Sequence, residues 1–147
     1  MPTILRPATL ADAPGIALAL AELGTDRYNV AATDLARRLP ALLTAPNAIV
    51  YVAVSPQGEI TGVCHVAGVR NLSTDGYAEV MELAVLSGWQ KQGIGRQLLD
   101  AAVQWTQQNH YARLRVRSST HRTEAHLFYE RYGFTRKDAS FAFEQIL

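Results

Sequence analysis

Short apolar stretches bounded by turn residues predict β-strands in the first part of the chain. They cover residues 3–6, 48–54, 60–69 and 77–86. The sequence SPQGE at residues 55–59 predicts the turn of a hairpin between the second and third strands. Residues 112–117 predict a further strand with Leu114 and Val116 facing inward. Its outward positions carry three arginines, Arg113, Arg115 and Arg117.

Two helices are predicted between the first two strands. A helix over about residues 10–23 follows Thr9 and Asp12, which resemble a capping box. A second helix is expected to begin at Thr33, with leucines at positions 35, 39, 42 and 43 on one side. We expect Pro40 to shorten or kink this helix, because proline cannot donate the helical hydrogen bond.

The second half of the chain predicts two further helices, one ending near Gln108 and one at Thr123–Tyr132. The tail SFAFEQIL, residues 140–147, alternates enough to predict a closing strand. Hairpins and helical crossovers are therefore mixed, which predicts an α/β (α+β) fold with three α-β-α layers around a mixed sheet. The length of 147 residues suits a single domain over 1–147.

Composition narrows the partners and the compartment. With 48% apolar residues and a net charge of +1, nothing in the chain calls for a nucleic-acid or membrane partner. Cys64 is the single cysteine, so no intrachain disulfide forms, and its apolar surroundings predict a core position. We see no signal peptide and no apolar run long enough to span a bilayer, which favours a cytoplasmic location.

The stretch WQKQGIGRQLL, residues 89–99, places two glycines where a helix begins. Free N–H groups and the helix dipole make such a start an anion site, and glycine lets phosphate oxygens approach the backbone. Leu98 replaces the third glycine of the dinucleotide fingerprint, and no Gly-Lys-Ser/Thr of a P-loop follows. A tight strand-to-helix turn without a ligand is the structural alternative.

Two motifs resemble the GNAT superfamily of N-acetyltransferases. Residues 90–95, QKQGIG, are similar to its central motif after a strand ending in an apolar-x-Val pattern, and residues 124–134, EAHLFYERYGF, resemble its next helix. The pattern is nearest to small-molecule members around the aminoalkylphosphonate N-acetyltransferase. The resemblance implies the GNAT fold and acetyl transfer from acetyl-CoA to a primary amine of a small molecule, by direct attack in a ternary complex. Dimers are common among similar proteins, so a homodimer is left open.

The resemblance also assigns site residues. Backbone groups of the strand end would bind the pantetheine arm, and N–H groups from Lys91 to Arg96 would hold the pyrophosphate. The full set implied for acetyl-CoA is Leu83, Ala84, Val85, Gln90, Lys91, Gln92, Gly93, Ile94, Gly95 and Arg96. The Lys91 and Arg96 side chains are alternatively solvated charges at a helix end.

Three residues are candidates for proton transfer. Tyr129 would protonate the thiolate, or be a core residue of its helix face. Glu79 and Glu82 are the candidate bases, and the resemblance favours Glu79, acting directly or through a water. Glu82 could instead orient substrate or serve the structure, and either could pair with an arginine of a neighbouring strand. In a regular strand, residues three apart face opposite sides, so only one would reach the substrate unless a bulge intervened.

The histidines predict no metal site. His121 and His126 are five apart and lie on different helix faces, and His65 could face the acceptor pocket although a core or surface place is favoured. The resemblance locates acceptor specificity in residues 23–34, 70–77 and 135–141, which contain charged and aromatic residues, among them Asp26, Arg27, Tyr28, Asp75, Tyr77 and Lys137. Alternatives for the function are a protein or peptide N-acetyltransferase, a non-catalytic acyl-CoA sensor, and an unrelated phosphate-binding module.

Overall fold

The computed structural model describes residues 3–24 and 31–147, which divide into two compact units meeting at Val116/Arg117. Asp26, Arg27 and Tyr28, named above as acceptor residues, lie outside the described residues. The elements of the first unit are β1 (Ile4–Pro7), η1 (Leu10–Asp12), α1 (Ala13–Leu20), η2 (Ala21–Leu23), α2 (Ala32–Thr44), β2 (Ala48–Val54), β3 (Ile60–Val69), β4 (Tyr77–Val85), α3 (Ile94–Gln108) and β5 (Leu114–Val116). The second unit contains α4 (Thr123–Tyr132).

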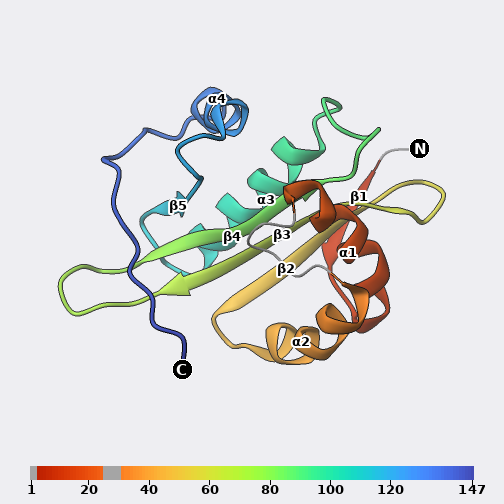
Figure 1. Ribbon diagram of the computed structural model, residues 1–147, viewed down its shortest axis with the longest axis horizontal. Helices are drawn as coiled ribbons and strands as arrows, with labels where there is room; N and C mark the ends of the chain where they lie inside the picture. The colour runs from red at the N-terminus through yellow and green to blue at the C-terminus, as the bar shows by residue number, and fades with distance from the viewer. Residues whose placement is uncertain (1–2, 25–30) are drawn as a thin grey trace. The chain divides into compact units, whose positions relative to one another are not determined.

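The first unit is built on a five-stranded sheet in the order β1-β2-β3-β4-β5. β1 to β4 pair antiparallel and β5 joins β4 in parallel, so the predicted mixed sheet is confirmed. Helices α1 and α2 cover one face and α3 the other, which gives the three predicted layers (Figure 1). We call these the α1 face and the α3 face.

The α1 face holds one core. Ile16 of α1 and Leu39 of α2 are almost fully buried against side chains from the strands, among them Val52, Val63 and Ala84. On the α3 face, Gly62 of β3 lies against Leu98 of α3, where the absence of a side chain lets the helix approach the sheet. Cys64 is buried as expected, and burial raises the pKa of its thiol to about 12.

An ion pair fixes the start of the first helical segment. Asp12 accepts hydrogen bonds from the Arg6 guanidinium at 2.7 and 3.0 Å and from the backbone N–H of Thr9 at 2.8 Å. The hydrogen bonds from Arg6 are the main cause that holds the pKa of Asp12 below its ordinary value. The capping interaction predicted from Thr9 and Asp12 is thus present, and the predicted helix is divided into η1, α1 and η2.

Two local expectations differ from the structure. Pro40 does not shorten α2, which continues to Thr44, because the buried Leu35 and Leu39 anchor the helix while Pro40 lies exposed; the alternative, a kink at Pro40, stays a prediction. The expected closing strand is not formed: residues 140–147 carry no strand and every one of them is exposed. Alternation gives a segment a two-sided pattern, but a strand also needs a neighbouring strand to accept its hydrogen bonds.

In the second unit, α4 ends at Gly133, whose φ of 130° is open to glycine but strained for other residues. The backbone N–H of Phe134 returns to the Tyr129 carbonyl at 3.0 Å. Tyr129 also makes edge-to-face ring contacts with Phe128 and Phe134, with centroids 5.5 and 5.8 Å apart. The aromatic residues of this helix therefore form a small cluster within the unit.

Candidate active site

A β-bulge in β4 decides which side chains of this strand face the same side of the sheet. His65 of β3 is opposite Glu82 of β4, but the next residue, Val66, is opposite Val80, so Met81 is the extra residue. Ala67, two residues from His65 and hence on the same face, is opposite Glu79. The bulge therefore brings Glu79 and Glu82 to the same face, the alternative to the opposite orientation expected for a regular strand.

That face is the α1 face, because Val63 and Ala84 share the parity of His65 and Glu82 and lie in the α1 core. Further along it, Arg115 of β5 is in register with Glu79 and stacks over the Tyr77 ring at 4.4 Å. Two carboxyl groups, an imidazole and a guanidinium thus share one surface beyond the apolar core.

Burial shifts the pKa values of two of these groups in opposite directions. Desolvation raises the pKa of Glu82, and the charge of Arg38 on α2 partly opposes the rise. Desolvation lowers the pKa of His65, which favours the neutral imidazole. Its Nε2 is buried and has no hydrogen-bond partner within residues 3–24 and 31–147.

The last residues of β4 present a half-paired edge. β5 pairs with β4 only at residues 78–80, and no strand of the described chain pairs with the same edge beyond them. The N–H of Leu86 donates to Thr61 on β3 at 2.8 Å, so by alternation the backbone groups of Leu83 and Val85 point to the open edge. This is where an extended ligand could add as a further strand, as the resemblance implies for pantetheine.

The loop that follows is rich in unused N–H groups. Among the described residues, the backbone N–H groups of residues 91–95 donate no hydrogen bond within the chain. Lys91 and Gly93 take left-handed backbone conformations, with φ of 62° and 86°, and Gly93 is the N-cap of α3. The loop is braced by its own side chains, since Gln90 donates to the Val85 carbonyl at 3.0 Å and Gln92 to Gly88 at 3.2 Å. Together with the dipole of α3, free amides in this arrangement have the chemistry to hold an anion.

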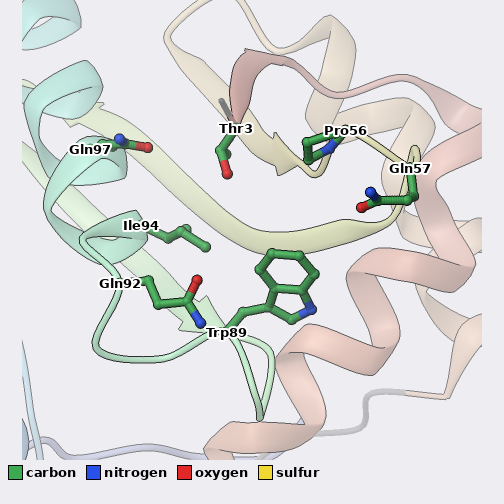
Figure 2. A pocket seen from close by; sticks show the side chains of 7 residues that line it. All are labelled: Thr3, Pro56, Gln57, Trp89, Gln92, Ile94 and Gln97. Atoms are coloured by element: carbon green, nitrogen blue, oxygen red, sulfur yellow. The ribbon is translucent and has the colours of Figure 1, made fainter. Parts of the chain in front are cut away.

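A hollow of about 440 Å³ lies beside this loop, and Figure 2 shows the side chains that line it. It is lined by Thr3, Pro56, Gln57, Trp89, Gln92, Ile94 and Gln97. Trp89 forms one wall and donates from its indole N–H to Glu59 at 3.1 Å. Glu79, Glu82 and His65 do not line the hollow, so we assign it to support of the loop and not to chemistry.

Residues 46–136, more than half of the chain, match the acetyltransferase (GNAT) domain family. The chain belongs to the GNAT acetyltransferase family. The family match runs through the bulged strand, the open edge and the amide loop. It also includes Tyr129 on α4, which the structure places in the aromatic cluster of the second unit.

Comparisons with individual proteins agree on the fold. Streptothricin acetyltransferase A of Bacillus subtilis (strain 168) is 32% identical over 60 residues, which are 41% of this GNAT chain and 35% of that relative. The alignment therefore spans about a third of that relative's length. A solved structure described as a transcriptional regulator from Bacillus halodurans C-125 covers 98% of this chain and 100% of its own, with 23% identity and a TM-score of 0.87. The structure of AAC(6')-Iy, in complex with a bisubstrate analogue of CoA and acetylneamine, covers all of both chains with 13% identity and a TM-score of 0.82.

Local sequence signals predicted the elements that carry the candidate site. The glycine pair stands at the start of α3 and the strand before it is β4, as expected, while the acetyl-CoA contacts assigned to them stay a prediction. The shared orientation of Glu79 and Glu82 was not predicted, because the bulge is defined by pairing with a strand far away in sequence. For His65 a core or surface place was favoured and the acceptor pocket was the alternative; its Nε2 is buried, and it lies on the same face as both carboxyl groups. Two searches of the described residues were negative: they contain no group of three or more potential metal ligands, and no helix long and apolar enough to cross a bilayer.

Proposed function

We propose that this GNAT protein transfers the acetyl group of acetyl-CoA to a primary amine of a small molecule. The observation that carries the proposal is an open strand edge at Leu83 and Val85, followed a few residues later by the N–H groups of residues 91–95, which donate no hydrogen bond within the described chain. It suits a ligand with an extended amide arm followed by a pyrophosphate. The family match crosses from the first unit into the second, which supports one catalytic domain over 1–147.

The acetyl-CoA residues follow from this proposal. Leu83, Ala84 and Val85 supply the strand edge, and the Val85 N–H would also donate to the oxyanion that develops on the thioester. Residues Gln90 to Arg96 supply the pyrophosphate cradle: Lys91, Gln92, Gly93, Ile94 and Gly95 through N–H groups, Gln90 by holding the loop, and Arg96 through its charge.

The proton steps fall to three side chains. The amine arrives as an ammonium ion, which has no lone pair for attack at neutral pH. Glu79 accepts its proton, and Glu82 on the same face orients it. The free amine then attacks the thioester carbonyl carbon, the C–S bond breaks, and Tyr129 gives its phenolic proton to the thiolate. The nitrogen loses its second proton to the Tyr129 phenolate, which leaves a neutral amide and restores the phenol.

A thiol-release assay tests the proposal. The purified chain is incubated with acetyl-CoA and a panel of amines: kanamycin, streptothricin, spermidine, L-lysine, 2-aminoethylphosphonate and a peptide. Cys64 adds no background to a thiol reagent, because its thiol is buried and its pKa is about 12. We expect thiol release with at least one small amine, and Glu79→Gln and Tyr129→Phe to lower kcat by about 10²–10⁴-fold.

Matched controls separate chemistry from damage to the fold. Glu144→Gln in the exposed tail and Tyr132→Phe on the same helix as Tyr129 should keep the wild-type rate. Full rates in both Glu79→Gln and Tyr129→Phe would show that the roles are assigned wrongly. Tight acetyl-CoA binding without thiol release would indicate an acyl-CoA sensor, release with the peptide alone a peptide acetyltransferase, and tighter binding of ATP or NAD than of CoA an unrelated phosphate-binding module.

A further inference from the structure

The buried Nε2 atom of His65 lowers the folding stability of the first unit, and nothing described so far explains why it is there. A buried polar atom without a hydrogen-bond partner destabilises a fold by about 1–3 kcal/mol. The residue lies in the middle of β3, between Val50 on β2 and Glu82 on β4, and its ring projects from the α1 face. Its neighbour on β2 is a valine and helix α1 is apolar, so neither offers Nε2 a hydrogen-bond partner.

The surroundings of His65 favour a positively charged ligand. The groups that share its face are Glu82 and Glu79 on β4 and Arg115 on β5, and from α2 the charge of Arg38 acts on Glu82. Residues 13–20 of α1 carry no charge. The nearest charged neighbour of the imidazole in the strand register is therefore a carboxyl group.

An ammonium ion has three N–H donors and needs three acceptors when it leaves water. The α1 face carries two carboxyl groups and one imidazole nitrogen without a hydrogen-bond partner, which is an acceptor in the tautomer protonated at Nδ1. We propose that His65 is a specificity-determining residue of the acceptor site, whose Nε2 accepts a hydrogen bond from the ammonium group of the substrate. This rests on the proposed function and adds to it a residue that binds the acceptor without removing its proton.

The proposal makes acceptor binding depend on the charge of the imidazole. Neutral His65 can accept the hydrogen bond, whereas protonated His65 has no lone pair and repels the ammonium ion. Burial lowers the pKa of His65 below 6.5, which keeps the acceptor form at neutral pH. The KM for the amine should therefore rise as the pH falls through that lowered pKa, while the KM for acetyl-CoA should not.

Two substitutions separate the hydrogen bond from the charge. His65→Phe removes the acceptor atom, so the KM for the best amine of the panel should rise about tenfold or more at every pH, with little change in kcat. His65→Gln keeps an acceptor oxygen that never protonates, so it should bind the amine near wild-type strength at pH 7.5 and lose less affinity than wild type at pH 5.5. Glu82 titrates in both proteins, so the difference between their pH profiles belongs to His65.

A second readout does not depend on turnover. In a ¹⁵N-edited NMR titration of the wild-type chain with the same amine, the Nε2 signal that His65→Gln removes should shift, and the signal of the exposed His121 should not. Thermal melting of both variants checks that the fold is intact. A His65→Phe protein that melts like wild type and keeps its amine KM overturns the inference and leaves the acetyltransferase standing. If no amine releases thiol from wild type, the proposed function and this inference fail together.

Discussion

Gly93 allows a sharp test of the anion site, because the cost of changing it can be worked out in advance. A Cβ at this position meets no atom within 4 Å, so Gly93→Ala introduces no clash. Its φ of 86° nevertheless lies in the left-handed region, where alanine is less stable than glycine by about 1 kcal/mol. In a chain of this length that corresponds to a loss in Tm of about 2–4 °C.

Gly58 is a matched control for the same change. It lies in the turn between β2 and β3, has a φ of 84°, and a Cβ there also meets nothing within 4 Å. Gly58→Ala and Gly93→Ala should therefore lower the Tm of the ligand-free protein by similar amounts. Only at Gly93 does the new methyl group enter the space above the free amides, where the pyrophosphate is proposed to bind.

The difference between the two variants measures the phosphate contact. Loss of one hydrogen bond to a charged group costs about 1.5–3 kcal/mol, so the Kd of Gly93→Ala for acetyl-CoA should rise by about 10–100-fold. Isothermal titration calorimetry with acetyl-CoA gives the Kd, and S-acetylpantetheine, which lacks the pyrophosphate, should bind wild type and Gly93→Ala equally. Equal acetyl-CoA affinities in wild type, Gly58→Ala and Gly93→Ala would refute the assignment of this loop.

Two further predictions concern stability. Gly68→Ala should lower the free energy of unfolding by about 1–3 kcal/mol in a denaturant titration, because its methyl group would overlap the Tyr111 ring, whose Cε2 would lie 2.8 Å away; an unchanged midpoint would contradict this packing. Asp12 has a lowered pKa in the folded state, so its ion pair with Arg6 adds stability above its ordinary pKa of 3.8 and loses it as the pH falls through the lowered folded value. The unfolding free energy of wild type should therefore fall more steeply with acid than that of Asp12→Asn, and parallel curves would show that the pair contributes nothing.

The sequence predicted the parts of this fold that depend on neighbouring residues. The glycine pair before Leu98, the capping residues Thr9 and Asp12, and the hairpin turn are local signals, and each corresponds to the structure. The bulge at Met81 depends on how β4 pairs with β3, and nothing in the letters around Met81 marks it. A one-residue change of register reverses the orientation of every side chain beyond it. This bulge, which the sequence does not mark, therefore determines that Glu79 and Glu82 both lie on the α1 face.

The least predictable segments were those in which the local sequence pattern and the packing of the fold disagree. The burial of Leu39 keeps α2 helical through Pro40, which is an effect of packing over local preference. The tail has the alternation of a strand without the pairing of one. The roles of Glu79, Glu82 and Tyr129 are inferred from family resemblance, and they stay predictions until the variants are assayed.

The half-paired edge of β4 also has a consequence for handling the protein. Backbone donors and acceptors left open at the border of a sheet attract other extended chains, and self-association commonly begins at such borders. A ligand laid along Leu83 and Val85 would occupy the same groups that a foreign strand needs. Preparations kept with coenzyme A should accordingly stay free of aggregates for longer than the bare polypeptide.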